Sequence, residues 1–467
     1  MNSFFRIFCG LSAIVTTIVC LIMLSGVFAY AFLLPIAFFL FLNFVNLTRI
    51  IWQCRPLTAY IITGLLWVRM VFLPLYGALT GAYTSNNASQ ELSQHFIGAV
   101  SLCFYDCIAV AVVLLLFTSK NNMTGHSNIT QGLYGQPGVY FLFVILALAL
   151  FLTVGRTMNL FDFIIKPIAE DLERGEELMG GRELIIRQFV GSGLVFLFLL
   201  VLAWLKHKHD SSMNSRYFYW SLICASLFIA VIVGERRTSL LYKAFASGFV
   251  LLSLYPDKGR KTVSFIGVAA LIVIAAMTIY KQFYGFMYSS YAEALQNVSM
   301  AQGFSYGLMD AYFYGIETVA KNIHYGRMMN LGIGQFIYDI VRNSFGINFF
   351  IPGGRLLTTQ IYNNIIYSGE QLTGLLLSSS GYGFIFFGYA FAPVITVFNA
   401  GIMLFFEKCL RRSKTIEWQY VFAFLFIRFG FGFLGATPPL INFVTRFFVI
   451  NALIIGAARM FKTRSSI

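Results

Sequence analysis

Long apolar blocks separated by shorter polar connections run through most of the chain. A helix needs about 20 consecutive apolar residues to cross a bilayer, and twelve blocks reach or approach that length. They are residues 5–24, 28–47, 57–80, 96–117, 138–155, 186–205, 217–233, 239–255, 262–280, 379–405, 417–434 and 441–460. The pattern predicts an all-α polytopic integral membrane protein with about 12 transmembrane helices, built as a single membrane domain over residues 1–467.

The basic residues of the connections predict the orientation. Lys and Arg accumulate in the cytoplasmic connections of membrane proteins. With a cytoplasmic N-terminus, five of the six inner connections hold two or more of them: residues 49–55, 206–216, 256–261 (PDKGRK), 407–414 (EKCLRRSK) and the tail from Phe461 (FKTRSSI). We therefore expect both termini in the cytoplasm.

The opposite side carries the polar mass of the chain. Residues 157–185 form a medium external loop with an acidic centre, and residues 281–378 form a large one. In the large loop, apolar residues follow Phe304 at helical spacing: Leu308, Tyr312, Ile316, Val319, Ala320 and Ile323. Glu317 and Lys321 lie off this stripe and form an i,i+4 pair. This pattern predicts an amphipathic helix that lies on the lipid surface or caps the helix bundle.

Composition excludes a soluble fold. Hydrophobic residues make up 58% of the chain and charged residues 11%, where a soluble protein has about a quarter charged residues. The mean hydropathy is +0.76. The net charge of +14 is explained by the cytoplasmic connections, so it does not indicate nucleic acid binding. No pair of the seven cysteines has the spacing of a metal or redox motif.

Several arginines fall where an apolar environment is expected. Arg69, Arg428 and Arg446 lie inside predicted spans, where an arginine either faces a polar cavity or snorkels to the interface. Arg236 and Arg237 lie in GERRTSLL, between two spans on the outer side. Two adjacent guanidinium groups there favour an anionic ligand, because guanidinium binds phosphate through paired hydrogen bonds. The alternative is contact with a carboxylate or a lipid headgroup.

Other candidate residues lie in the two external loops. Arg182 and Arg187 are the medium-loop arginines nearest the next span, and either add to an anion site or belong to a solvated, salt-bridged helix. His324 is the histidine of the large loop, and its side chain suits a general base because histidine titrates near neutral pH. The competing acids are Glu317, Asp310 and Glu370.

Familiar nucleotide and metal motifs are absent from the sequence. We find no DxD, Walker A, HExxH or dinucleotide-binding motif, and no cytoplasmic domain of the size that a nucleotide sugar needs. Any chemistry is therefore expected on the outer side, without a metal or another cofactor, and driven by an activated substrate in the membrane.

In this arrangement the chain resembles the Wzy-type O-antigen and capsule oligosaccharide repeat-unit polymerases. The resemblance covers most of the chain and depends more on architecture than on motifs. A Gly-x-Arg element at a span end is Gly234-Glu235-Arg236, and Arg-x10-Gly patterns in the external loops are matched by Arg182…Gly193 and Arg342…Gly353. The acidic-aromatic element often found after the large loop of this family is replaced by GLLLSSSGYG.

The resemblance implies glycosyl transfer at the outer face of a bacterial inner membrane. It makes undecaprenyl-pyrophosphate-linked oligosaccharides the substrates, with membrane lipid, a chain-length regulator and a flippase as further partners. It assigns pyrophosphate binding to five arginines, Arg236, Arg237, Arg342, Arg182 and Arg355, because guanidinium groups stabilise the charge that develops on that leaving group. It makes His324 the first choice for the catalytic base and Glu317 the second.

Three alternatives remain open. An O-antigen ligase has a similar fold and similar arginines, with a different acceptor. A lipid-linked oligosaccharide flippase is a transporter that also often has twelve spans, but it favours pseudo-repeat halves and short external loops. A scaffold in an envelope complex would tolerate loss of the arginines.

Overall fold

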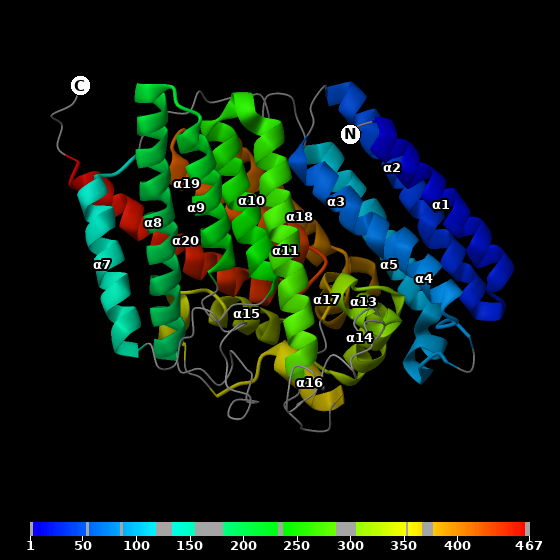
Figure 1. Cartoon of the computed structure of the whole chain (residues 1–467). Coiled ribbons are helices and arrows are strands. Elements are labelled where there is room, and N and C mark those ends of the chain that lie inside the picture. The colour runs from blue at the N-terminus through cyan, green and yellow to red at the C-terminus, as the bar shows by residue number, and fades with distance from the viewer. Residues whose placement is uncertain are drawn as a thin grey trace. The chain divides into compact units, whose positions relative to one another are not determined.

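The computed structural model of the protein describes residues 3–52, 56–84, 87–117, 133–154, 181–231, 237–285, 305–351, 354–366 and 377–462. Within these residues the chain is helical (Figure 1). The one pairing of extended backbone among them is an isolated antiparallel bridge between Ser378 and Gly435.

The chain forms two compact units. Unit 1 comprises Met1–Gly125, Met300–Lys408 and Arg428–Phe443, and unit 2 comprises His126–Ser299, Cys409–Ile427 and Val444–Ile467. The helices that lie in unit 1 alone are α1 (Ser3–Met23), η1 (Gly26–Phe32), α2 (Leu33–Trp52), α3 (Leu57–Trp67), η2 (Val68–Phe72), α4 (Leu73–Leu79), α5 (Gln90–Phe117), α13 (Tyr306–Phe313), α14 (Ile316–Met328), α15 (Ile333–Arg342), η5 (Ile347–Phe350), α16 (Thr358–Ile366) and α17 (Ser379–Phe391).

Unit 2 holds a second group of apolar helices. These are α7 (Pro137–Val154), α8 (Gly181–Ser212), α9 (Arg216–Ala230), α10 (Arg237–Leu254), η3 (Pro256–Lys258) and α11 (Gly259–Gly285). Three further helices contribute residues to both units: α18 (Val394–Arg412), α19 (Ile416–Gly432) and α20 (Thr437–Met460). Within unit 2, α8 packs against α7 and α9, and α10 packs against α9 and α11.

The membrane character of the chain is borne out by its helices. Within the described residues, six stretches are long and apolar enough to span a bilayer: Phe4–Met23, Gly26–Val45, Leu57–Leu79, Gln90–Phe117, Gln188–Ser212 and Thr437–Met460. Three predicted spans coincide with shorter apolar helices, Pro137–Leu152, Arg216–Ala230 and Leu240–Leu254. The predicted count of twelve is not confirmed, because these pieces are shorter than the roughly 20 residues that a span needs.

The span predicted over 379–405 is not one straight helix. It is divided into α17 and α18, which are bent by 114° at their junction, and the spans number seven if this pair is counted as one. Pro393 lies in the break and has no amide hydrogen to continue the helical ladder. Gly388 interrupts α17 with φ at 68°, a conformation that glycine adopts readily.

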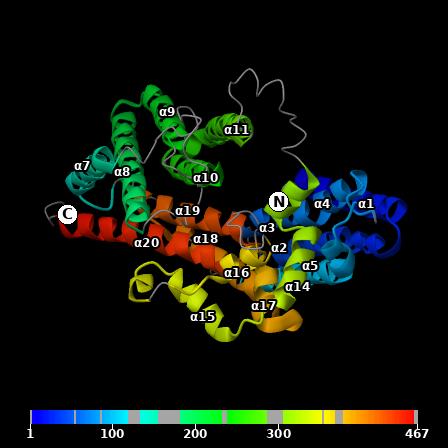
Figure 2. The same ribbon diagram turned by 90° about the horizontal axis from the view of Figure 1, so that it is seen from below.

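In unit 1, a layer of short helices packs on the long ones (Figures 1 and 2). The long helices α1, α2 and α5 pack in succession, and α14 packs against α5 and α17. A core of buried residues between α14, α16 and α17 includes Tyr362 and Tyr382, which are both 0% exposed. The large loop predicted over 281–378 is therefore built of packed helices where the structure describes it.

The apolar stripe predicted in this loop is divided between two helices. Ile316, Val319, Ala320 and Ile323 are buried on α14 as predicted, whereas Leu308 and Tyr312 on α13 are exposed. The helices are separated by Tyr314, which has a left-handed backbone with φ at 54°, and by Gly315. A side chain at Gly315 would collide with the carboxylate of Asp310, so the turn requires glycine there.

Candidate functional site

The carboxylate of Asp310 fixes the start of α14. Its Oδ1 accepts a hydrogen bond from the backbone N–H of Glu317 at 3.2 Å, and its Oδ2 accepts from the N–H and the hydroxyl of Thr318, each at 2.7 Å. These are N–H groups that the first turn of a helix leaves without partners. Asp310 thus caps α14 from the neighbouring helix, and burial raises the pKa of this carboxyl group to about 6.

Arg69 joins the turn between α13 and α14 to the long helices. It lies in the π-helical turn η2 and is 1% exposed. Its Nη1 donates to Oδ2 of Asp106 on α5 at 3.0 Å, and its Nε donates to the carbonyl oxygen of Tyr314 at 2.8 Å. The other oxygen of Asp106 accepts from the hydroxyl of Thr396 at 2.9 Å. Arg69 therefore lies in a buried ion pair. The sequence had left open a polar cavity or a position at the membrane interface, and neither alternative specified this partner.

Arg428 and Arg446 are the other two arginines predicted inside spans. The guanidinium of Arg428 lies 4.8 Å from the ring centre of Phe443. Arg446 is 8% exposed and belongs to unit 2.

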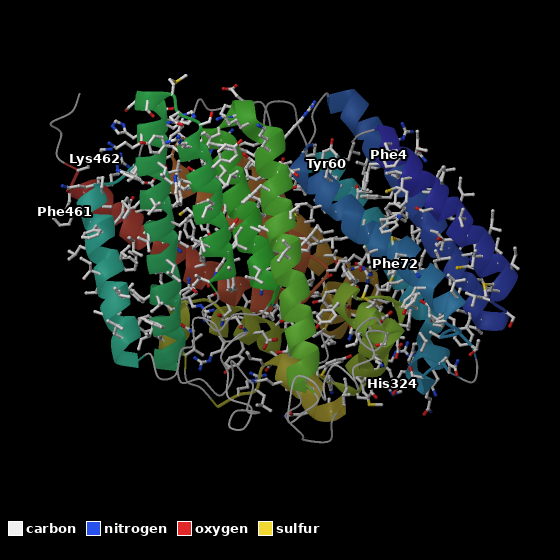
Figure 3. All side chains as sticks on the ribbon, viewed as in Figure 1. Phe4, Tyr60, Phe72, His324, Phe461 and Lys462 are labelled. Carbon is white, nitrogen blue, oxygen red and sulfur yellow. The ribbon has the colours of Figure 1, made fainter. Side chains whose placement is uncertain are left out.

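His324 on α14 faces a second histidine that the sequence analysis did not single out. Its Nδ1 lies 3.2 Å from Nε2 of His95 on α5, with one nitrogen donating and the other accepting according to the tautomers. When Nδ1–H of His324 donates to Nε2 of His95, Nε2 of His324 carries the lone pair that can accept a proton from a substrate. His324 is half-buried and is labelled in Figure 3.

A second contact ties α14 to α5 beside the histidine pair. The hydroxyl of Tyr325 donates to Oε1 of Glu91 at 2.8 Å. The ring of Tyr325 stands edge-on to His324, with centroids 4.9 Å apart. The imidazole of His324 is thus held by neighbours on two sides, which is the fixed orientation that a general base requires.

Glu317 forms the helical pair that its spacing predicted. Its Oε1 accepts from Nζ of Lys321 at 2.7 Å, with both side chains partly exposed. Glu317 lies seven residues before His324, so the two share one face of α14 and are about 10 Å apart along its axis. Since the carboxylate of Glu317 is already paired with a cation, His324 is the better placed base.

Arg342 and Arg355 lie beside one another at the end of α15. Nη1 of Arg342 donates to the carbonyl oxygens of Asn348 at 2.9 Å and Ile351 at 3.4 Å. The guanidinium of Arg355 lies over the ring of Tyr338, one helical turn before Arg342, at 5.5 Å from the centroid. Among the described residues no carboxylate forms an ion pair with either arginine.

The remaining predicted residues are described less fully. Arg182 and Arg237 lie in the first turns of α8 and α10, in unit 2, and their side chains are outside the described set. Arg236 and Glu370 lie outside the described residues. The predicted meeting of the unit 2 arginines with Arg342 therefore stays a prediction.

Within unit 1 the structure thus contains two groups of candidate residues. His324 and Glu317 share α14, and Arg342 and Arg355 meet around Tyr338 on α15. No hydrogen bond or ion pair between described residues joins the first group to the second. No group of three or more His, Cys, Asp or Glu residues suited to a metal ion was found among the described residues.

Comparison with known proteins gives no relative for this chain. No family model, no curated protein and no solved structure matches it.

Proposed function

We propose that the chain is an oligosaccharide repeat-unit polymerase of the Wzy type, which transfers a growing glycan from a lipid pyrophosphate to the hydroxyl group of a second lipid-linked repeat unit. The observation that carries the proposal is the set of contacts made by the guanidinium group of Arg342. Its guanidinium is held by two backbone carbonyl oxygens and by no described carboxylate, which leaves a fixed, partly exposed positive charge. Such a group suits a pyrophosphate, because guanidinium binds phosphate oxygens in pairs.

The proposed reaction divides the work between the two groups of residues. The acceptor hydroxyl attacks the anomeric carbon of the donor glycan, and the bond from that carbon to the pyrophosphate oxygen breaks. The proton of the hydroxyl passes to Nε2 of His324, while undecaprenyl pyrophosphate leaves as the anion. Arg342 and Arg355 stabilise the negative charge on the leaving group. The same role for Arg236, Arg237 and Arg182 remains the prediction made from the sequence. Glu317 is the second candidate for the base.

The residue types and the frame of unit 1 support this division. Catalysis between two lipid-borne substrates depends on orientation, and a group of helices packed on membrane-capable helices supplies a rigid platform for it. The hydrogen-bonded imidazole pair is suited to accept a proton, and the two arginines without a described carboxylate partner are suited to an anion. An O-antigen ligase would use the same chemistry with another acceptor, so the product decides between the two enzymes.

The test uses proteoliposomes that contain the purified chain and lipid-linked repeat units extracted from the cells that make them. Long glycans on the lipid carrier are expected from the wild type. His324→Ala is expected to reduce the rate about 10²–10⁴-fold, as for loss of a general base, and Arg342→Ala about 10²–10³-fold, as for loss of one charge-stabilising donor.

Arg216→Ala is the matched control, because Arg216 is exposed and lies in a predicted cytoplasmic connection. It is expected to keep the wild-type rate. Transfer to lipid A–core in place of chain growth would identify a ligase. Undiminished polymer in both the His324 and the Arg342 variants would refute the proposed site.

A further inference from the structure

Helix α15 exposes apolar side chains and buries polar ones. Ile333 and Ile337 lie one turn apart and are 60% and 55% exposed, whereas Gln335 and Asp339 on the opposite face are each 1% exposed. A helix on the surface of a water-soluble protein has the reverse arrangement, with its apolar stripe toward the core. The exposed face of α15 is therefore built for a surrounding that is apolar.

The buried polar face is held by hydrogen bonds within the protein, although Oε1 of Gln335 has no partner among the described residues. Asp339 accepts hydrogen bonds from the hydroxyl of Tyr382 at 2.8 Å, from Nε2 of Gln335 at 3.0 Å and from the backbone N–H of Thr358 at 3.2 Å. Nε2 of Gln335 also donates to the carbonyl oxygen of Leu356 at 2.9 Å. These bonds fix how α15 is rotated about its axis, so the isoleucines cannot turn inward without breaking them.

The apolar surface continues beyond the helix. In η5, Ile347, Phe349 and Phe350 are 55%, 62% and 88% exposed. Arg342 and Arg355 border this surface, and neither is neutralised by a described carboxylate. Apolar side chains bordered by arginines match a lipid bilayer, whose acyl chains accept the former and whose phosphates attract the latter.

The exposed face of α15 also matches the lipid-facing sides of the long helices. Phe4 on α1 is 81% exposed and Leu152 on α7 is 73% exposed, as is expected of residues that face acyl chains. A polar interior with an apolar exterior is what a bilayer requires of every helix that it contains.

We propose that α15 and η5 are inserted into the outer leaflet of the surrounding bilayer, with Ile333, Ile337, Phe349 and Phe350 among the acyl chains and Arg342 and Arg355 at the phosphate level. The sequence predicted lipid contact or bundle capping for the stripe that follows Phe304, and this proposal assigns lipid contact to α15 and η5, which lie later in the same loop. It does not depend on the proposed function, because it follows from the polarity of α15 alone. The occupant of the surface is bulk phospholipid.

The test places a photoreactive benzoylphenylalanine at position 350 or 337 of the full chain. Position 350 tolerates the change because Phe350 is 88% exposed and aromatic. The control carries the same group at position 213, since Met213 is 79% exposed in a predicted cytoplasmic connection. Each protein is reconstituted in vesicles of phosphatidylethanolamine and phosphatidylglycerol, irradiated and weighed by mass spectrometry.

A mass increase of one phospholipid is expected at positions 350 and 337 and not at 213. Adding Ile337→Gln to the protein labelled at 350 should lower the yield of the adduct. A cross-link between two copies of the chain would overturn the proposal, as would no lipid adduct in either position. An adduct that forms only in native membranes, with the mass of a polyprenyl lipid, would also overturn it in favour of a specific lipid.

Discussion

Two neighbouring helices of unit 1, α14 and α15, have opposite polarity. Helix α14 buries Ile316 and Val319 and turns Glu317 and Lys321 outward, whereas α15 buries Asp339 and turns Ile337 outward. Both are amphipathic, and both lie between the same two apolar blocks of the sequence. The difference therefore cannot come from amphipathicity itself.

What differs is how each helix is held. The apolar face of α14 packs against α5 and α17, and its start is capped by Asp310. The inward face of α15 is instead held by hydrogen bonds to Asp339 and Gln335. Hydrophobic burial thus orients α14 with its polar face toward water, and buried hydrogen bonds orient α15 with its apolar face toward lipid. If α15 lies in lipid as proposed, the two candidate groups of the site, on α14 and α15, meet different media, which suits the proposed action on a sugar attached to a lipid.

The largest effect is expected from breaking the anchor of α14. Arg69→Ala would leave Asp106 charged and buried without its partner, which costs about 3–5 kcal/mol of unfolding free energy. Since Arg69 also holds the carbonyl of Tyr314, hydrogen exchange should rise in α14 more than in α15. Thermal unfolding in detergent and hydrogen exchange by mass spectrometry measure the two effects.

The control for this prediction replaces both charges. Arg69→Met with Asp106→Leu removes the pair without leaving a lone charge, so it should recover most of the stability. A single substitution that leaves the melting temperature unchanged would contradict the role of Arg69 as an anchor.

The next effect is a pH dependence located at the start of α14. Burial raises the pKa of Asp310 from 3.8 to about 6. Between these values the folded protein keeps a proton that the unfolded chain has released, so this group's contribution to stability is greatest below pH 3.8 and is lost as the pH rises through 6. The loss is on the order of 3 kcal/mol.

Asp310→Asn stays neutral at every pH and should lack this decline. The measurement is the difference in unfolding free energy between the wild type and the variant, followed from acid to neutral pH in detergent. The wild type is expected to lose stability relative to the variant as the pH rises. Parallel pH profiles would contradict a raised pKa at Asp310.

A third prediction concerns the orientation of the base on α14. His95→Ala removes the group that lies 3.2 Å from Nδ1 of His324, and misplacement of a reacting group can cost up to about 100-fold in rate. His95→Gln keeps a polar atom near the position of Nε2 and should restore much of the activity. The assay is the glycan transfer described above. If His324→Ala is inactive while His95→Ala is fully active, His95 has no positioning role.

Contacts between near neighbours in the chain were predictable from the sequence. The membrane-capable apolar helices, the buried residues of α14 and the pair between Glu317 and Lys321 follow from hydropathy and helical spacing. The structure confirms them, although not the predicted count of twelve spans. Helix α15 itself could have been recognised, because Ile333, Phe336 and Ile337 are spaced as on one face of a helix. Its rotation could not, because that depends on Tyr382 and Thr358, which come later in the chain.

The contacts that shape the site join distant residues. Arg69 and Asp106 are 37 residues apart, and His95 and His324 are 229 apart. No spacing rule links such pairs, and a polar residue inside an apolar block indicates only that a partner exists. The bend before α18 had a local signal in Gly388 and Pro393, but the apolar run around them outweighed it in the prediction of a single span.

The smallest predicted effects are the stability losses on removing one i,i+4 polar pair from α14 and one from α15. Lys321→Ala removes a partly exposed i,i+4 ion pair on α14, so the loss should be about 0.3–0.5 kcal/mol and should shrink as salt is added. Gln335→Ala removes the i,i+4 partner of Asp339 on α15, and because both residues are buried, the loss should be about 1–3 kcal/mol and insensitive to salt. Unfolding in detergent at low and high ionic strength measures both. Equal losses with equal salt dependence would mean that the polar pairs of α14 and α15 are equally accessible to water. The contrast between the two helices would then be lost.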